Sequence, residues 1–357
     1  MIANETRLWQ PLGKRFGWLA GVSLTDNRTQ LNRSLETDEF SASTTGVLNT
    51  VSEMTVYGEA NARLFEGLIA TAGARYTRSQ LGGSGEDVPL AVAIAGREIT
   101  ASRDETAFLP SFSLLAELLP HTSLYIRYQE GFRPGGLAIE GNFVRRFRND
   151  RAATFEVGLR HGRPGRGPFD LTASVAHTRW RDIQADFIDA FGLPSTANIG
   201  DGRVLTASMS GSVAISTALR LSGGFTYNDS AIDQPDSAFL ARTMQVPNIA
   251  RYAGRIGLDY VTPLTDTLDL TAQGWASYIG KSRLGLGPEL GELQGDYFDS
   301  GLVVRIGRDA LGISLGISNI ADVRGNRFAL GTPFAVGREH VTPLQPRTIR
   351  LGVDATF

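Results

Sequence analysis

The last ten residues, TIRLGVDATF (348–357), alternate between apolar and polar side chains up to the final residue. Every second side chain from Ile349 to Phe357 is apolar, and the side chains between them are polar or glycine. Chain ends are usually polar and poorly ordered, whereas a period of two residues is the signature of a β-strand. The pattern therefore predicts a terminal strand with one apolar and one polar face, held in place by other parts of the protein.

The same period runs through most of the chain. It is plain in LIATAGARYT (68–77), TFEVGLRHG (154–162), LRLSGGFTYN (219–228) and LGISLGIS (311–318). No stretch of a dozen residues has a helical period, so the predicted fold class is all-β. About fifteen strands are expected, near residues 3–9, 15–26, 51–65, 66–80, 99–117, 121–131, 151–162, 168–188, 197–215, 218–232, 248–262, 266–283, 293–307, 309–320 and 345–357.

The connections between these strands alternate in length. Short links such as FEG (65–67) and LPH (119–121) are followed by long ones, at about 27–50, 81–98, 132–150, 189–196, 233–247, 284–292 and 321–344. Several predicted strands exceed about ten residues, which is long enough to cross a bilayer when tilted. Short turns at one end and long loops at the other are typical of an antiparallel transmembrane up-and-down β-barrel. The alternative is a soluble β-sandwich, whose strands also alternate but whose loops need not be sorted by length.

The two faces of the predicted strands differ in the way a barrel requires. One face carries small and hydrophilic residues, which suit a water-filled lumen. The other is apolar and often aromatic near the strand ends, as expected of rings at a membrane interface. These rings belong to Trp18, Tyr76, Tyr128, Phe155, Tyr227, Tyr260, Tyr278 and Phe298.

Composition excludes several classes of function. The 35 Lys and Arg nearly balance the 37 Asp and Glu, which argues against a nucleic-acid-binding protein. Cysteine is absent, which excludes disulfides and zinc-thiolate sites. The four histidines are scattered, and no set of residues has the spacing of a metal site or a catalytic constellation. The chain is therefore not expected to be an enzyme or to bind a cofactor or metal.

Several longer motifs occur in a defined order. They are VSEMTVYGEANARLFEGLIATAGARYT (51–77), SLYIRYQEGFRPGGL (123–137), RAATFEVGLRHG (151–162), DLTASVAHTRWRDIQADF (170–187), ANIGDGRV (197–204), GISNIADVRGNRF (316–328) and PRTIRLGVDATF (346–357). Each motif alone is weak, but the ordered set covers nearly the whole chain and resembles the TonB-dependent outer-membrane receptors. The resemblance implies active uptake of a scarce nutrient across the bacterial outer membrane, most often a ferric siderophore or other iron complex. A passive porin-like channel is the alternative.

The resemblance also sets an expectation about completeness. Receptors of this family have a 22-stranded barrel filled by an N-terminal plug domain, with a TonB box ahead of the plug. No signal peptide, TonB box or plug is recognisable, and MIANETRLWQ (1–10) reads as barrel sequence. The whole chain, 1–357, is therefore expected to be an N-terminally truncated receptor barrel domain with about 15 of 22 strands. Such a fragment is expected neither to close nor to transport on its own, and to reach TonB only through the missing N-terminal part.

Two groups of side chains are candidates for ligand binding. Arg133, Arg145, Arg146 and Arg148 could recognise an anionic ligand such as a ferric siderophore, because guanidinium groups bind carboxylates in pairs of hydrogen bonds. The alternatives are a solvated loop or contact with lipopolysaccharide phosphates. Trp180 and Phe187 could stack on a ligand at the extracellular mouth, or belong to the aromatic girdle. The GFRPGG stretch (131–136) is expected to be structural, since its proline and glycines release the chain from the sheet.

The terminal strand has an expected partner of its own. Leu351, Val353 and Phe357 would face lipid, and the closing aromatic residue would lie at the periplasmic interface. In outer-membrane barrels a terminal strand of this kind resembles the signal that the barrel-assembly machinery reads by strand pairing. The expected partners are therefore outer-membrane lipid, lipopolysaccharide and the assembly machinery.

Overall fold

The computed structural model describes residues 1–31, 34–36, 41–43, 46–86, 101–140, 143–188, 194–236, 245–286, 293–308, 310–329 and 341–355. Every regular element in this part of the chain is a β-strand. Among these residues there is no helix of the length and apolarity needed to span a membrane. The predicted all-β fold class is confirmed.

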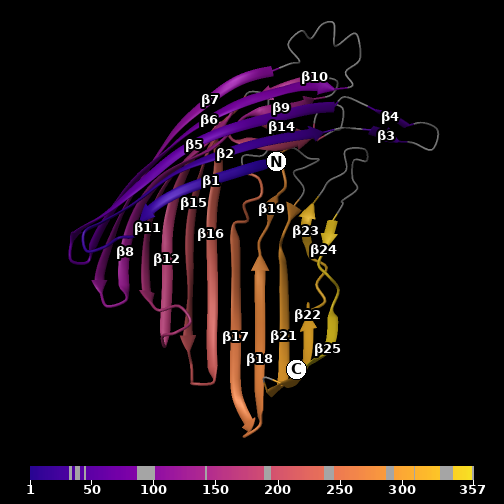
Figure 1. Cartoon of the computed structure of the whole chain (residues 1–357). Coiled ribbons are helices and arrows are strands. Elements are labelled where there is room, and N and C mark those ends of the chain that lie inside the picture. The colour runs from indigo at the N-terminus through magenta and orange to yellow at the C-terminus, as the bar shows by residue number, and fades with distance from the viewer. Residues whose placement is uncertain are drawn as a thin grey trace.

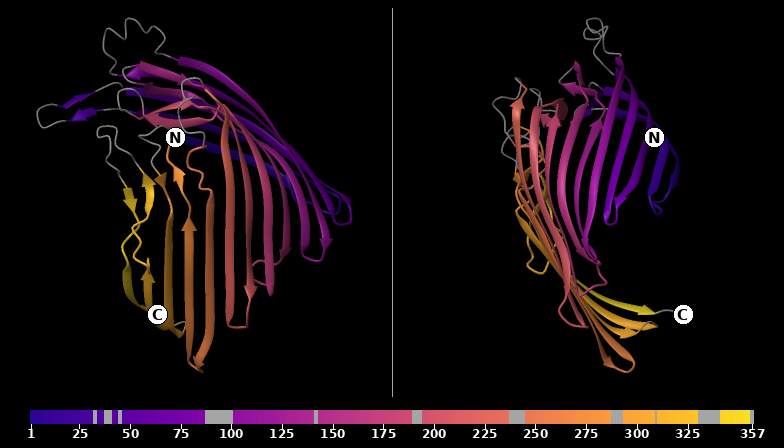
Figure 2. Two further views of the ribbon diagram at one scale, coloured as in Figure 1. Left: turned by 180° about the vertical axis from the view of Figure 1, so that it is seen from behind. Right: turned by 90° about the vertical axis from the view of Figure 1, so that its left-hand side faces the viewer.

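Fifteen strands form one antiparallel sheet, in which each strand pairs with the next sheet strand along the chain. They are β1 (Ile2–Gln10), β2 (Phe16–Leu31), β5 (Gly46–Phe65), β6 (Leu68–Glu86), β7 (Ala101–Leu119), β8 (Thr122–Arg133), β11 (Asp150–Gly162), β12 (Phe169–Arg181), β15 (Gly200–Ala214), β16 (Leu219–Pro235), β17 (Tyr252–Thr265), β18 (Leu268–Ile279), β21 (Tyr297–Arg308), β22 (Leu311–Ser318) and β25 (Thr348–Ala355). The sheet curves into a wide arc (Figure 1). Within the described residues β1 and β25 do not pair with each other, so the barrel is partial (Figure 2).

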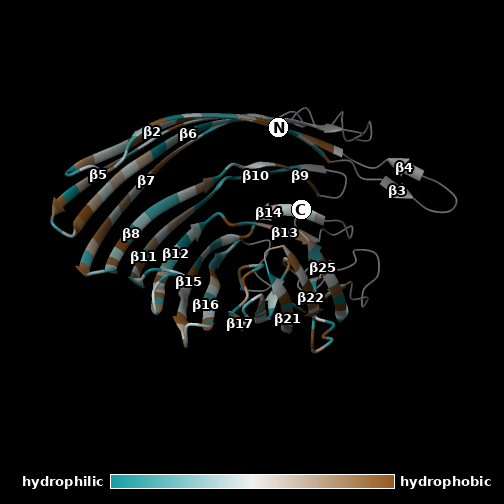
Figure 3. Ribbon diagram, turned by 60° about the horizontal axis from the view of Figure 1, so that its bottom comes forward, coloured by the Kyte–Doolittle hydropathy of each residue, from teal (hydrophilic) through white to brown (hydrophobic). Residues whose placement is uncertain are grey.

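Ten shorter strands form five separate hairpins, all in the long connections. They are β3 (Ser34–Glu36) with β4 (Ser41–Ser43), β9 (Gly136–Glu140) with β10 (Phe143–Phe147), β13 (Gln184–Ile188) with β14 (Pro194–Asn198), β19 (Ser282–Arg283) with β20 (Leu293–Gln294), and β23 (Asn326–Ala329) with β24 (Val341–Pro343). Hairpins β9–β10 and β13–β14 lie within the curve of the sheet, whereas β3–β4 extends away from it (Figures 1 and 3).

The predicted alternation of short and long connections is confirmed. The short ones between sheet strands are 11–15, 66–67, 120–121, 163–168, 215–218, 266–267 and 309–310. The long ones are 32–45, 87–100, 134–149, 182–199, 236–251, 280–296 and 319–347. Because the strands are antiparallel, all long connections leave from one end of the sheet, called here the loop end, and all short ones from the other.

The strand register assigns each side chain to a face, because residues directly opposite each other on paired strands point the same way. One continuous row runs Tyr227, Ala207, Val175, Val157, Ile126, Leu114 and Ala70 across seven strands. This row lies on the outer, convex face of the arc, since the hairpins cover the other, inner face (Figure 3). Every one of the eight predicted girdle aromatics falls on the outer face by this register.

Four of the predicted strands are longer than the strands that form. The predicted strands 168–188, 197–215, 266–283 and 293–307 are each divided into a long sheet strand and a short hairpin strand. The divisions coincide with residues in the left-handed region of φ at three of these places, Asp182 (φ 51°), Gly200 (φ 123°) and Asp296 (φ 57°). A residue with positive φ turns the chain out of the ladder, so each polar-apolar alternation continues through a bend that the period alone does not reveal.

Candidate functional site

The candidate site is the loop end of the inner face, where hairpins β9–β10 and β13–β14 fold over strands β5 to β16. β8 ends at Arg133, and Pro134 and Gly135 lead directly into β9. Proline has no N–H to donate and glycine turns freely, so the chain leaves the sheet at this point. β12 ends at Arg181 and bends at Asp182 into β13, and β14 returns through Gly200 to β15.

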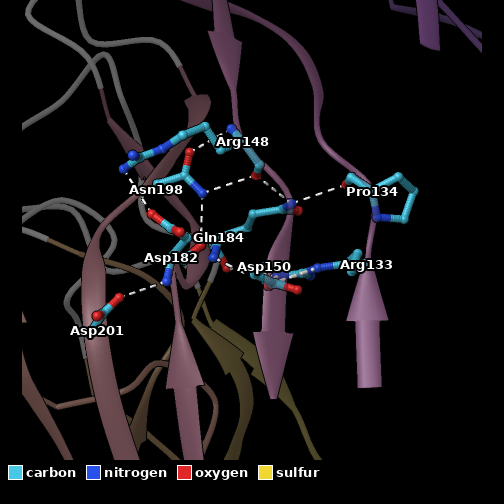
Figure 4. Close-up of polar contacts among 8 residues, drawn as sticks. All are labelled: Arg133, Pro134, Arg148, Asp150, Asp182, Gln184, Asn198 and Asp201. Carbon is cyan, nitrogen blue, oxygen red and sulfur yellow. Dashed lines mark hydrogen bonds and ion pairs between the residues drawn. The ribbon is translucent and has the colours of Figure 1, made fainter. Parts of the chain in front are cut away.

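An arginine and an aspartate join the sheet to the second hairpin. Arg133 and Asp150 lie opposite each other on β8 and β11. The Arg133 guanidinium contacts Asp150 Oδ2 through Nη2 at 2.5 Å and through Nε at 3.1 Å. Its Nη2 also donates to the carbonyl of Gln184 at 3.1 Å (Figure 4). The Asp150 carboxylate is only 4% exposed, so this pair fixes the first residue of β13 to the sheet.

The Gln184 side chain then joins both hairpins. Its Nε2 donates to the carbonyls of Pro134, at 3.0 Å, and Arg148, at 2.9 Å. These two carbonyls flank hairpin β9–β10 at its two ends (Figure 4). One amide therefore satisfies two backbone acceptors that leave the sheet ladder, which is the role buried polar side chains usually have.

Asn198 closes the same network from β14. Its Nδ2 donates to the carbonyls of Arg148, at 3.0 Å, and Asp182, at 2.7 Å, and its Oδ1 accepts from the Arg148 N–H at 2.6 Å. The Arg148 guanidinium pairs with Asp182 Oδ1 at 2.8 Å. Asp201 Oδ1 accepts from the Asp182 N–H at 2.8 Å, which holds the bend in place (Figure 4).

A second set of contacts fixes hairpin β9–β10 to β5 and β7. Asn49 pairs with the backbone of Leu137 in both directions, at 2.9 Å to its carbonyl and 2.8 Å from its N–H. The Glu105 carboxylate accepts from the Gly135 N–H at 3.2 Å and is paired with Arg103. Arg103 also reaches the carbonyl of Phe147 at 3.4 Å. The side chain of Asn49 thus satisfies both backbone polar groups of Leu137 and fixes β9 to β5.

Apolar side chains fill the space under both hairpins. The larger cluster joins the alternate residues of β13–β14 to the sheet and to two neighbouring loops, and comprises Ile183, Ala185, Phe187, Ala197, Ile199, Val204, Ile232, Val246 and Leu286. The smaller one comprises Val47, Leu137 and Ile139. Burial at about 25 cal/mol per Å² of apolar surface is the main stabilising term for such a contact. The hairpins are therefore packed parts of the fold, with the polar network at their edges.

Beside this packed region the inner face is open. A hollow of about 440 Å³ lies on strands β2, β5, β6, β7 and β8 and is lined in part by Glu53, Tyr57, Glu59, Arg75 and Gln129. The Arg75 guanidinium lies 5.8 Å from the centre of the Tyr57 ring, a cation–π distance. The hollow offers carboxylates, an amide and a cation to a polar solute.

The four arginines predicted to bind a ligand have different surroundings. Arg133 and Arg148 use their guanidinium groups in the network above, although each side chain is more than half exposed. Arg145 and Arg146 lie on β10, half-buried and exposed respectively. Arg146 lines a small cleft together with Arg103 and Leu137. A ligand role for these four residues stays a prediction.

The two predicted stacking aromatics are not placed at an open mouth. Phe187 is 3% exposed and lies inside the larger apolar cluster, so its ring has no free face for a ligand. Trp180 is half-buried on the inner face and packs against the same cluster. The aromatic girdle would lie on the outer face, whereas Trp180 and Phe187 both lie on the inner side of the sheet. The alternating sequence around Trp180 and Phe187 does not indicate a separate apolar core at the loop end.

The terminal strand has the predicted faces. Leu351 and Val353 are 77% and 70% exposed on the outer face, opposite Leu315 and Ile313 of β22. Phe357 lies outside the described residues. Recognition of this strand by the assembly machinery stays a prediction. Among the described residues there is also no group of three or more His, Cys, Asp or Glu side chains placed to hold a metal ion.

Sequence reasoning missed the residues that hold the hairpins in place, namely Asn49, Glu105, Asp150, Gln184 and Asn198. A signal for some of them was present, because GFRPGG, DIQ and ANIGDG are polar stretches with turn-forming residues inside alternating sequence. Their mutual contacts join residues up to 88 positions apart, as for Asn49 and Leu137. No local pattern contains such a pairing.

Comparison with known families identifies the fold. The family model described as TonB dependent receptor-like, beta-barrel, matches residues 4–320. The chain belongs to this family. Family membership also agrees with the prediction that the chain is not an enzyme, since the family consists of receptors. No curated protein matches the sequence.

Solved structures show the same receptor barrel. The ferric yersiniabactin uptake receptor FyuA from Yersinia pestis is 15% identical, with a TM-score of 0.80 over 98% of this chain and 53% of that one. The ferric-catecholate import receptor Fiu from E. coli K12 is 17% identical, with a TM-score of 0.74 over 99% of this chain and 54% of that one. The copper transporter OprC is 15% identical, with a TM-score of 0.71 over 99% of this chain and 58% of that one. The chain thus spans about half the length of these receptors.

Proposed function

We propose that this chain forms part of a TonB-dependent receptor that takes up a scarce nutrient, most often an iron complex such as a ferric siderophore, across the bacterial outer membrane. The observation that carries the proposal is the pair of hairpins fixed over the inner face at the loop end by Arg133, Asp150, Gln184 and Asn198. A rigid polar rim around an open inner face is what a receptor needs to hold a solute on one side of the membrane. Two of the similar proteins are receptors for ferric complexes and one is a copper transporter, which supports a metal complex as the solute.

The proposed location is the outer membrane, with the outer face of the sheet against lipid. That face carries many exposed apolar side chains, among them Val175, Phe155 and Leu351. A lipid environment removes such a surface from water. The proposed partners are lipid, lipopolysaccharide, the assembly machinery at β25, and TonB through a plug-bearing N-terminal part.

The proposed ligand is anionic, and the arginines of hairpin β9–β10 are the groups that would meet it. Arg145 and Arg146 lie on the strand of this hairpin that follows its tip, at the loop end. Hydrogen bonds from guanidinium to carboxylate or to other charged oxygens contribute about 1.5–3 kcal/mol each, which is about tenfold or more in affinity.

The test measures binding of a ferric catecholate and a ferric carboxylate complex to the full chain in detergent, by quenching of tryptophan fluorescence. Binding is expected for the parent chain and is expected to weaken about tenfold in Arg145→Gln/Arg146→Gln. The control is Arg308→Gln, at the short-turn end of β21. No binding of either complex, together with free passage of sugars through vesicles that hold the chain, would instead support a porin-like channel.

A further inference from the structure

Three arginines gather on the outer face at the loop end of β11 and β12. Arg151 is the second residue of β11. Arg181 is the last residue of β12, and Arg179 lies two residues before it. The register places all three on the outer face, the face that also carries Ala153 and Phe155. None of them takes part in the inner-face network that holds the hairpins.

The register sets like charges directly opposite each other. Arg151 on β11 faces Arg181 on β12, and Arg179 on β12 faces Arg203 on β15. Like charges in directly opposite positions destabilise a sheet. Two such pairs in adjacent rows are an arrangement that the sheet alone does not favour.

The acidic groups nearby neutralise only part of this charge. Asp233 forms an ion pair with Arg203, and Glu130 accepts a hydrogen bond from the Tyr128 hydroxyl at 2.5 Å. Asp229, also on the outer face, lies opposite Leu205. The Arg151 guanidinium donates to the carbonyl of Thr106 at 3.1 Å.

Within the described part of the chain, Arg179 and Arg181 make no ion pair or hydrogen bond. Another outer-face cation at the same end behaves differently, since Arg78 of β6 is paired with Asp104 of β7 at 2.6 Å. The unpaired charges at β12 are therefore a local feature and do not recur at β6.

The same arginines surround a hollow. Its volume is about 500 Å³, and its lining includes Glu130, Arg151, His177, Arg179 and Arg181. Three guanidinium groups and one carboxylate give this hollow an excess of two positive charges when His177 is neutral. A hollow of this size and charge fits one phosphate group with its first sugar.

The position of the arginines along the strands matches a lipid headgroup. Going from the loop end, the rows on β11 and β12 read Arg151–Arg181, Ala153–Arg179, Phe155–His177 and Val157–Val175. Each row is about 6.6 Å below the previous one, because a strand rises about 3.3 Å per residue and every second residue shares a face. The cations thus lie just beyond the point where the outer face becomes apolar.

We propose that Arg151, Arg179 and Arg181 bind the phosphate of a phosphorylated glycolipid in the outer leaflet. This rests on the proposed outer-membrane location of the chain. Guanidinium groups match phosphate oxygens with pairs of charge-assisted hydrogen bonds. The bound phosphate lies between the opposing arginines and removes their repulsion, while the acyl chains lie along Phe155 and Val157.

The test uses the full chain in a zwitterionic detergent and measures retention of bisphosphorylated lipid A by native mass spectrometry. The parent chain retains lipid A, and Arg179→Gln/Arg181→Gln lowers its affinity about tenfold or more. The matched control is Arg78→Gln, which removes an outer-face cation whose charge Asp104 already balances, and which leaves lipid A affinity within about twofold. Circular dichroism checks that each variant keeps the β-sheet spectrum.

Two further arms identify the source of the phosphate. Lipid A without phosphates is expected to bind the parent no better than it binds the double variant, and 10 mM inorganic phosphate alone is expected not to displace lipid A. Equal lipid A affinity of parent and double variant overturns the proposal, as does full displacement by inorganic phosphate. Failure of the chain to insert into phosphatidylcholine vesicles counts against the membrane location itself, whereas insertion without lipid A binding counts against this site alone.

Discussion

The two faces of β11 and β12 are formed by alternate residues of the same two strands, yet the polar groups on them have different surroundings. On the inner face the hydroxyls of Thr154 and Thr178 are 2.8 Å apart, and Ser174 lies 2.9 Å from Ser208 of β15. On the outer face the rows are apolar, and the polar groups at the loop end are like-charged arginines. Inner-face groups find partners across the ladder, whereas Arg179 and Arg181 on the outer face have no ion pair or hydrogen bond within the described residues.

This difference teaches that alternation alone does not make two equivalent surfaces. The inner face is stabilised by contacts that the chain makes with itself, including those with the two hairpins. The outer face leaves apolar side chains such as Val175 about half uncovered by the chain, at 52% exposure. Substitutions on the two faces should therefore destabilise the protein for different reasons.

The largest expected effect comes from truncating a ring that lies under the hairpins. Phe187→Ala leaves a cavity in the larger apolar cluster and should cost about 3–5 kcal/mol of local stability. Hydrogen exchange of the Ile183 and Ile199 amides, which bond to Gly200 and Ile183 across the hairpin base, measures this loss. The comparison is Phe155→Ala on the outer face, which should leave both amides protected. Unchanged protection in Phe187→Ala would contradict the assignment of this ring to a core.

The next largest difference in stability is expected when a charged side chain is placed in the middle of each face. Val175→Arg puts a cation into the apolar rows of β12 and should cost about 2–4 kcal/mol in a bilayer. Ala176→Arg adds the same charge to the inner face, opposite Glu156, and should cost much less. Urea unfolding in phosphatidylcholine vesicles compares the two. Equal costs would mean that the outer face does not lie against lipid.

The alternating sequence predicts the sheet but not the core beneath the hairpins. The period of two residues predicts the fifteen sheet strands and the face of each girdle ring, because strand geometry converts spacing directly into direction. The alternation of short and long connections predicts their up-and-down order. The same period continues through Ile183, Ala185 and Phe187, and so the prediction extended one strand from 168 to 188. Nothing in the alternation distinguishes a row facing lipid from a row packed under a hairpin.

The polar network at the loop end was less accessible to prediction. Arg133 is predicted to bind a ligand because guanidinium groups pair with carboxylates, whereas the carboxylate that it contacts is Asp150, which lies across an intervening hairpin of the chain. In the sequence, Gln184 and Asn198 have no feature that sets them apart from other polar residues. Only in the fold do the hairpins bring both side chains to the carbonyl of Arg148. Such roles follow from three-dimensional proximity, which a single sequence does not contain.

Ion pairs on the two faces provide a third, smaller contrast. Asp150→Asn removes a buried carboxylate from Arg133 and should destabilise the base of β13 by about 1–3 kcal/mol, less than a fully buried pair because Arg133 is half exposed. Asp104→Asn removes the partner of Arg78 on the outer face, where both side chains are half exposed, and should change stability less than Asp150→Asn does. Protection of the Gln184 amide reports the first loss. A larger effect of Asp104→Asn would reverse the comparison.

The smallest expected effect is a titration at the loop end. Asp296 accepts a hydrogen bond from the Tyr278 hydroxyl at 2.8 Å and pairs with Lys281 at 3.1 Å, and these contacts lower the pKa of its carboxyl. The folded state therefore binds the Asp296 proton less readily than the unfolded chain does. Its small contribution to stability is present above the ordinary aspartate pKa of about 3.9 and is lost as the pH falls through the lowered value.

Carboxyl NMR measures this titration directly. The Asp296 midpoint should lie below the ordinary value in the parent chain, and both Tyr278→Phe and Lys281→Gln should raise it, because each removes a group that lowers the pKa of this carboxyl. A midpoint that ignores Tyr278→Phe would show that this hydrogen bond does not form.

The neighbour-to-neighbour order of the sheet makes strands removable in pairs but not singly. Each sheet strand runs opposite to the one before it, so deleting β15 and β16 together leaves β12 antiparallel to β17, with long connections still at one rim. Deleting β15 alone would reverse the direction of every later strand and carry half of the long loops to the wrong side of a membrane. Insertions and deletions that respect this fold should therefore come in whole hairpins, and its size can change only in steps of two.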